Sequence, residues 1–192
     1  MSLTEEQAKT LLQVAKESIQ QGLDKNQHLS VVLSDYTEEL QENRASFVTL
    51  EIHKQLRGCI GTLTAYQPLI RDVAYHAYAA AFSDPRFPKL TREEFPLLDI
   101  HISILSRSDP ISFESEEHLI QQLRPGIDGL ILTEGAHNKG TFLPAVWESL
   151  NNPDDFISHL KQKAGLSPNY WSDSIKVERY TTESIYESKV YR

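Results

Sequence analysis

Residues 56–63, Leu-Arg-Gly-Cys-Ile-Gly-Thr-Leu, combine the residue types in this chain that are best suited to chemistry. Cys59 is the only cysteine among 192 residues, and Arg57 stands two positions before it. A thiolate acts as a nucleophile, a redox group or a metal ligand, and a neighbouring cation favours the thiolate. A free cysteine also serves as a small buried hydrophobic residue. Cys59 is therefore a candidate catalytic residue, with a purely structural role as the alternative.

Two glycines, Gly58 and Gly61, interrupt what otherwise has the character of a β-strand. Glycine gives up side-chain packing in a strand, so the pair predicts a bulge or a close approach by another backbone or a ligand. Alternation along a strand places Arg57, Cys59 and Gly61 on one face. We therefore expect the guanidinium and the thiol to share a face, and both glycines to shape a binding site.

Residues 84–87, Asp-Pro-Arg-Phe, supply a second group of polar side chains. The planar guanidinium of Arg57 can clamp a carboxylate or phosphate of a ligand, or pair with a structural carboxylate such as Asp84 or Glu51. Asp84 before a proline is also an ordinary start of a turn. If Arg57, Asp84 and Arg86 edge one groove, the guanidinium should lie within about 10 Å of the 84–87 loop, the reach of two long side chains.

Seven histidines are available to partner the thiol, but no spacing compels a Cys–His dyad. His53 and His101 fall on predicted strands, and His137 falls in a predicted loop. The chain has no zinc-finger spacing, no His-Glu-x-x-His and no glycine-rich phosphate loop. The sequence therefore predicts no metal site and leaves any cofactor unknown.

The elements that must position these residues are strands and helices in no regular alternation. Apolar periodicity and turn residues predict helices over 4–22, 68–82, 116–123 and 153–165, with a short helix after Pro144. They predict strands over 45–52, 56–63, 100–104, 130–132, 141–143 and 174–180, and a connecting stretch over 24–43. The expected fold is α+β, with a mainly antiparallel sheet and flanking helices.

Composition limits the classes of protein to which the chain can belong. At 192 residues and 40% hydrophobic content, we expect a single domain over residues 1–192, or one domain with a small lobe. The net charge of -8 argues against a broad nucleic-acid surface. The sequence predicts neither a membrane span nor a signal peptide, and a lone cysteine fits a reducing compartment, so we expect a cytoplasmic protein.

The octapeptide over 56–63 resembles the signature of the AMMECR domain family, and further segments resemble that family in order along the chain. These are residues 81–87, the Ile-Ser-Ile-Leu-Ser run over 102–106, the glycine-rich hairpin with 126–130 and 142–144, and the helix over 156–166. Ala145 stands where the family commonly has glutamine, so no role of that side chain carries over.

Two hypotheses follow for function. The resemblance implies a shared pathway or complex with Memo-like and radical-SAM proteins, so the first is a binding or partner module. Its groove would lie along the 56–63 strand, with Arg57, Gly58, Gly61, Asp84 and Arg86 as binding residues. The second is a small enzyme that uses Cys59, with His53, His101 or His137 as partner. Access to Cys59 and its distance from a base distinguish the two.

Overall fold

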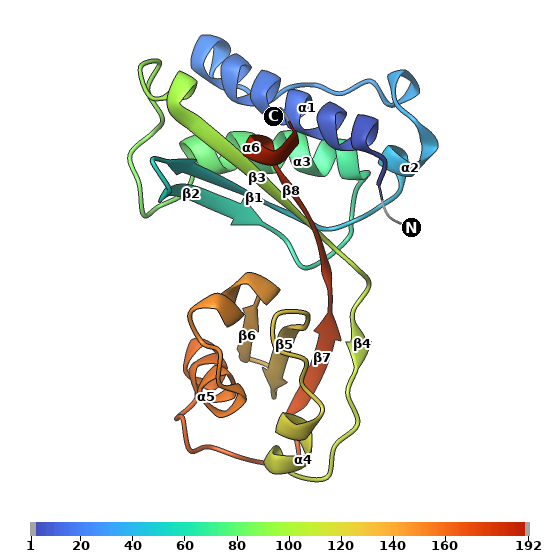
Figure 1. The fold of residues 1–192 in the computed structure, drawn as a ribbon, viewed down its shortest axis with the longest axis vertical. Helices are drawn as coiled ribbons and strands as arrows, with labels where there is room; N and C mark the ends of the chain where they lie inside the picture. Colours follow the sequence, from blue (N-terminus) through green and yellow to red (C-terminus); the bar gives the residue numbers. More distant parts are fainter. Residues whose placement is uncertain (1–2, 191–192) are drawn as a thin grey trace. The chain divides into compact units, whose positions relative to one another are not determined.

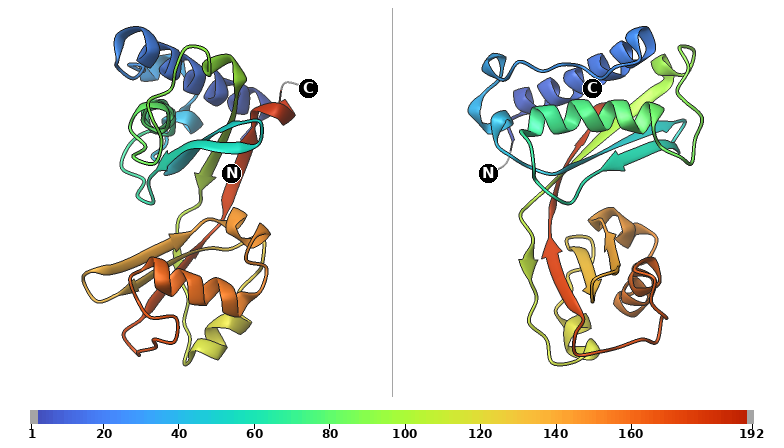
Figure 2. Two further views of the ribbon diagram at one scale, coloured as in Figure 1. Left: turned by 90° about the vertical axis from the view of Figure 1, so that its left-hand side faces the viewer. Right: turned by 180° about the vertical axis from the view of Figure 1, so that it is seen from behind.

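The computed structural model describes residues 3–190, and the chain divides into two compact units (Figures 1 and 2). Of the described residues, unit 1 comprises 3–105 and 183–190, and unit 2 is Ser106–Thr182. Each unit has its own antiparallel sheet and its own helices, so the fold is α+β, as the sequence predicted.

Unit 1 is a four-stranded sheet with two long helices packed on one face (Figure 1). The strand order is β2-β1-β3-β8, which makes β2 an edge strand. The strands are β1 (Ser46–Ile52), β2 (Gln55–Gly61), β3 (Leu98–Leu105) and β8 (Thr182–Tyr186). The helices are α1 (Glu5–Lys25) and α3 (Leu69–Phe82), with the short α6 (Glu187–Val190) near the end of the chain.

The core of unit 1 lies between these helices and one face of the sheet. Strand residues at every second position, including Val48, Leu50, Ile100 and Ile102, are fully buried against apolar residues of α1 and α3. The intervening strand residues are only partly buried. The sheet therefore has one dry face and a second face, turned away from α1 and α3, that carries polar side chains.

The predicted helices form, with small differences at their ends. The capping box of Thr4 and Gln7 opens α1, and the helix continues past Gly22 to a left-handed cap at Asn26. Gly22 does not end the helix because it is a buried packing position. The connecting stretch over 24–43 contains a 3-10 turn, η1 (Leu33–Asp35), and the short α2 (Glu38–Gln41). A further 3-10 turn, η2 (Phe95–Leu97), precedes β3.

Unit 2 is a second four-stranded sheet in the order β4-β7-β5-β6. Its strands are β4 (Asp109–Pro110), β5 (Gly129–Glu134), β6 (Asn138–Phe142) and β7 (Lys176–Tyr180). Its helices are α4 (Glu116–Gln121), η3 (Pro144–Glu148) and α5 (Pro153–Lys163). The hairpin predicted around residues 130–143 is β5 and β6. The last predicted strand ends at Tyr180, as expected, but the chain then continues into β8 of unit 1.

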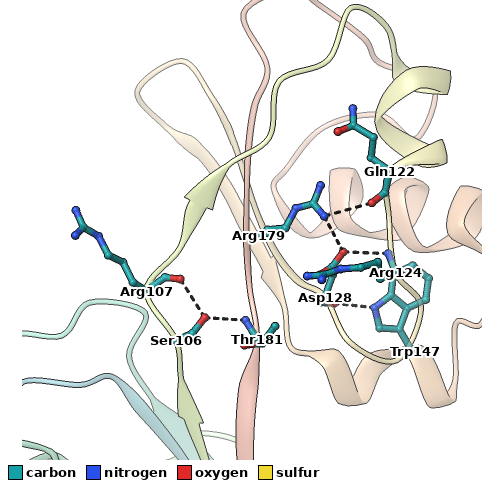
Figure 3. A network of polar contacts seen from close by, with 8 residues as sticks. All are labelled: Ser106, Arg107, Gln122, Arg124, Asp128, Trp147, Arg179 and Thr181. Atoms are coloured by element: carbon teal, nitrogen blue, oxygen red, sulfur yellow. Dashed lines mark hydrogen bonds and ion pairs between the residues drawn. The ribbon is translucent and has the colours of Figure 1, made fainter. Parts of the chain in front are cut away.

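A buried carboxylate organises the loop before β5 in unit 2 (Figure 3). Asp128 is fully buried, and its Oδ1 accepts from the Nε and Nη2 of Arg124 at 3.0 and 2.6 Å. Arg179 of β7 lies 3.6 Å from Asp128 Oδ2, and the indole of Trp147 donates to the Asp128 carbonyl at 2.7 Å. Two arginines therefore compensate one buried charge, which ties a loop, a strand and η3 together.

Within residues 3–190, no helix combines the length and the apolar character needed to cross a membrane.

Candidate functional site

The register of β2 against β1 shifts inside the signature sequence. Gly58 pairs with Leu50, whereas Leu56 pairs with Glu51, so Arg57 is one extra residue in the ladder. Such a bulge breaks the alternation of side chains on which the prediction of a shared Arg57–Cys59 face was based. That prediction is therefore corrected, because the side chains of Arg57 and Cys59 contact different parts of unit 1.

Both glycines of the signature strand are sites of close approach. A Cβ at Gly58 would lie 2.1 Å from the carbonyl oxygen of Ala80, so the backbone of α3 occupies the space that a side chain would need. A Cβ at Gly61 would lie 2.3 Å from the ring of Phe47 and 2.4 Å from the carbonyl oxygen of Ser46. The space beside both glycines is filled by the protein itself, and their role in binding remains a prediction.

Arg57 is buried and bound to the loop that follows α3. Its Nε and Nη2 donate to the two carboxylate oxygens of Glu94 at 2.8 and 2.9 Å, and Nη2 also donates to the Pro88 carbonyl at 3.0 Å. Pairing with Arg57 lowers the pKa of Glu94. The structural carboxylate is thus neither Asp84 nor Glu51. Arg57 Nη1 is buried without a hydrogen-bond partner in the described residues.

The 84–87 loop reaches β2, as the spacing of the sequence predicted. The Arg57 guanidinium lies 5.9 Å from the centroid of the Phe87 ring, and the Arg86 guanidinium lies 5.5 Å from the same centroid. One phenyl ring therefore contacts both arginines, a geometry that favours cation–π attraction. The binding role assigned to these residues remains a prediction.

Asp84 and Arg86 bind the backbone of Cys59 from the outer side of the edge strand. Asp84 Oδ2 accepts from the Cys59 N–H at 2.9 Å, and Arg86 Nη2 donates to the Cys59 carbonyl at 3.3 Å. The two side chains also pair with each other at 2.7 Å, and the hydrogen bonds from Arg86 hold the pKa of Asp84 well below its usual range. Together they occupy the backbone groups that a further strand would use, which closes β2 to strand addition at this residue.

The thiol of Cys59 lies on the polar face of the sheet. It is partly buried, and the hydroxyl of Thr49 on β1 donates to Sγ at 3.2 Å. The register places Thr49 between Cys59 and His101 of β3. The ring of His101 in turn packs edge-on against Tyr186 of β8, with centroids 4.7 Å apart. A thiol, a hydroxyl, an imidazole and a phenol thus form one row across the sheet, which we call the cross-strand row.

Of the three candidate histidines, only His101 belongs to this row. His53 occupies the turn between β1 and β2 with a left-handed φ of 52°, and His137 lies in unit 2. Adjacent strands are about 4.8 Å apart, so His101 and Cys59, two strands apart, are separated by roughly 10 Å. This spacing excludes a direct Cys–His hydrogen bond, so a Cys–His pair could act only on a group that lies between the two side chains.

Two carboxylates border the imidazole. His101 Nε2 lies 3.5 Å from Asp99 Oδ2 and 3.9 Å from Glu51 Oε2. These groups give this end of the row a negative potential when the imidazole is neutral. Within residues 3–190, no three histidine, cysteine or acidic side chains are grouped so as to hold a metal ion.

Sequence reasoning missed Thr49, Glu94 and Tyr186. Glu94 had a detectable signal, because its spacing from Thr91 is that of a capping box, and the Thr91 N–H donates to Glu94 Oε2 at 2.9 Å. Its second partner, Arg57, is 37 residues away and no local pattern reveals it. Thr49 was detectable only as a register neighbour of Cys59, and Tyr186 lies on a strand that was not predicted.

The AMMECR1 family model matches residues 12–185 of the chain, a range that includes β2, the 84–87 loop and all of unit 2. The chain belongs to the AMMECR1 family. A protein from Methanothermobacter thermautotrophicus is 31% identical over 191 residues, and the alignment covers 96% of each chain. A protein from Methanocaldococcus jannaschii is 33% identical over 165 residues, or 82% of this chain and 80% of the relative.

The fold is also shared with a solved structure. The crystal structure of an uncharacterized protein from Pyrococcus horikoshii matches with a TM-score of 0.88 at 30% identity, and the match covers 96% of this chain and 93% of that chain. The family membership inferred from residues 56–63 and the further segments along the chain is confirmed by the family model. The names of these relatives state no activity, so the function is inferred from the site.

Proposed function

We propose that this AMMECR1-family protein is a partner-binding module that uses the polar face of the unit 1 sheet along β2. The observation that carries the proposal is that neighbouring side chains hold Cys59 in a fixed position. Asp84 and Arg86 fix both backbone groups of this residue, and Thr49 contacts its thiol. A side chain fixed in this way loses little entropy when a partner binds, which favours recognition.

The binding residues predicted from the sequence take different parts in this proposal. Gly58 and Arg57 shape β2, because they meet α3 and Glu94 respectively. Asp84 supports the edge, and Arg86, whose side chain is 54% exposed, is the member of the set best able to reach a ligand. Gly61 leaves room for the ring of Phe47 beside the cross-strand row.

We propose Memo-like and radical-SAM proteins as the partners, on the basis of the family resemblance, and the cytoplasm as the location. The reducing cytoplasm would keep the only thiol of the chain free. The test is binding of the purified protein to a Memo-like and a radical-SAM protein from the same genome, measured by biolayer interferometry. Loss of a well-placed contact in an interface weakens binding by about tenfold or more.

The variants for this test are Leu56→Ser and Arg86→Gln on the β2 side, with Ile127→Ser as the matched control in unit 2. Leu56 and Ile127 are similarly exposed, at 43% and 51%. We expect the two β2 variants to bind more weakly while Ile127→Ser binds as the parent does. Equal binding by all variants, at unchanged melting temperature, would remove the β2 face as the partner surface.

A second candidate function is cysteine-dependent catalysis, which the Thr49–Cys59 hydrogen bond favours. The Thr49 hydroxyl donates to Sγ, and Arg86 holds the backbone carbonyl of the same residue, so the thiol has a fixed position on the sheet. His101 would act as the acid or base on a group that lies over Thr49. Modification of the thiol with iodoacetamide tests this candidate, because an unreactive Cys59 in the folded protein would exclude it.

A further inference from the structure

Exposed apolar side chains gather on one part of unit 1, away from the cross-strand row. Seven large apolar residues are strongly exposed in the described chain, and three of them are Val32, Tyr66 and Tyr75, at 59%, 55% and 44%. Single exposed apolar residues are ordinary, whereas a contiguous group marks an interaction surface. Whether these three side chains are contiguous therefore decides how they should be interpreted.

Contacts of α3 connect Tyr75 and Arg71 with the segment that carries Val32. Tyr75 of α3 packs edge-on against His28, with centroids 5.7 Å apart. Arg71, one turn before Tyr75 on α3, donates to the carbonyl of Val31, the residue before Val32, at 3.4 Å. The side chain of Gln67 donates both to the Tyr66 hydroxyl and to Asp72 Oδ1 at 3.0 Å, which places Tyr66 beside the first turn of α3, next to Arg71. We call this group of Val32, Tyr66, Arg71 and Tyr75, with His28, the Tyr75 patch.

The patch has a cation with no carboxylate partner. Arg71 is exposed, and within residues 3–190 no aspartate or glutamate forms an ion pair with it. Its neighbour Asp72 is fully buried and points inward, where it accepts from the Ser46 hydroxyl at 2.7 Å and contacts His76 at 3.1 Å. The chain has a net charge of -8, so this uncompensated guanidinium among aromatic rings contrasts with its overall charge.

We propose that the Tyr75 patch is a docking surface for an acidic segment of another protein, with an Asp or Glu paired to Arg71 and an apolar side chain against Tyr75 and Val32. Arginine and tyrosine are the residue types that dominate binding energy at interfaces, and they do so where an aromatic surface excludes water around a charge pair. An arginine fork also pairs with a carboxylate in a fixed geometry. An acidic partner is therefore favoured over a basic one.

This surface is independent of the proposed function. The cross-strand row lies on the sheet face turned away from α3, whereas the Tyr75 patch lies on α3 and on the residues before α2. A protein that binds partners on both surfaces can bridge two of them. Variants of one surface should leave binding at the other unchanged, so failure of one proposal is distinguishable from failure of the other.

The test is selection of a phage-displayed library of random linear peptides on the purified full-length protein. We expect the selected peptides to be enriched in Asp or Glu next to an aromatic or aliphatic residue. Synthetic copies should bind about tenfold more weakly to Arg71→Ala and to Tyr75→Ala, as measured by fluorescence polarisation. Binding should also weaken with added salt, because an exposed charge pair is screened.

Two substitutions in unit 2 serve as matched controls. Arg107→Ala removes an exposed arginine, and Ile127→Ala removes an exposed apolar side chain. Both should leave peptide binding unchanged. Selected peptides without acidic residues, or peptides that bind Arg71→Ala as well as the parent, would overturn the proposal. Sedimentation of the parent as a dimer that Tyr75→Ala dissociates would also overturn it, because a second copy would then occupy the patch.

Discussion

At the scale of single residues, each buried charge near β2 is compensated by a specific partner. Arg57 forms two hydrogen bonds with Glu94, and Asp84 accepts hydrogen bonds from Arg86 and Cys59. Breaking a buried pair costs far more than the pair contributes, because the remaining charge stays desolvated. Loss of function in variants of these residues must therefore be separated from loss of folding.

Asp84 should make the stability of the protein depend on pH. Its folded-state pKa is lowered, chiefly by Arg86, so its contribution is fully present above the unfolded pKa, near 3.9, and is lost as the pH falls below it. At pH 7, Asp84→Asn should lower the free energy of unfolding by about 2 kcal/mol, the contribution of a charged hydrogen bond. Urea denaturation at a series of pH values should show the difference between parent and variant shrinking below about pH 4.

Asp173→Asn, at an exposed position, is the control for this experiment. A difference between the parent and Asp84→Asn that stays constant down to pH 3 would contradict the assignment.

The reactivity of Cys59 should depend on Arg86 and Thr49 more than on Arg57. Arg57 donates hydrogen bonds to Glu94 and Pro88, whereas Arg86 and Thr49 contact Cys59 directly. Arg86→Gln and Thr49→Val should therefore slow alkylation by iodoacetamide, by up to about tenfold, because thiol reactivity depends on the donors and cations around it. Intact mass measured over time follows the reaction without ambiguity, since the chain has a single thiol.

Arg57→Gln is the comparison variant, and Thr49→Ser should recover the rate because it restores the hydroxyl. Equal rates in the parent and Thr49→Val would exclude a role for the hydroxyl.

At the scale of elements, local periodicity predicted most helices and the strands of the β1–β2 and β5–β6 hairpins. The bulge in β2 and the strand β8 depend on long-range contacts, and they were missed. The stripe over 68–82 and the alternation over 45–52 follow from one buried face each, so they are visible in the sequence. The bulge at Arg57 is not, because it depends on the approach of α3 at Gly58 and on Glu94. β8 was missed because its place beside β3 is set by the fold of unit 1. The start of unit 2 at Ser106 was missed because the composition of the chain does not change there.

The packing of α3 on β2 should be sensitive to one added methyl group. In Gly58→Ala the Cβ would lie 2.1 Å from a helix carbonyl that cannot rotate away, so the strand and α3 must separate. We expect a loss of roughly 2–3 kcal/mol in the free energy of unfolding, typical of overpacking against a fixed neighbour. Thermal and urea unfolding measure it.

Gln55→Ala, in the same strand and at an exposed position, should change stability little. A Gly58→Ala protein as stable as the parent would mean that α3 adjusts its position at low cost.

At the scale of the whole molecule, the two units have separate cores. One cluster of buried apolar residues lies entirely in unit 1 and the other entirely in unit 2. Both tryptophans, Trp147 and Trp171, belong to unit 2. Tryptophan fluorescence therefore reports on unit 2 alone, whereas far-ultraviolet circular dichroism reports on both units. This difference allows the stability of each unit to be followed in the intact chain.

Asp128→Asn should separate the unfolding of the two units. The substitution removes the carboxylate that accepts hydrogen bonds from Arg124 and pairs with Arg179, and should destabilise unit 2 by about 2 kcal/mol, the contribution of a charged hydrogen bond. The fluorescence transition in urea should shift to lower concentration than the transition measured by circular dichroism. Coincident transitions in this variant would show that the units unfold as one.

The path of the chain through unit 1 has a consequence for how the protein can be divided. The chain leaves unit 1 at Leu105 and returns at Glu183, yet β3 and β8 are neighbours in one sheet. The two connecting stretches are joined where they leave it, since the Ser106 N–H donates to the Thr181 carbonyl at 2.9 Å and the Thr181 N–H donates to the Ser106 hydroxyl at 2.9 Å. Unit 2 is therefore an insertion within a hairpin, and a tight turn in its place would keep every strand of the host sheet.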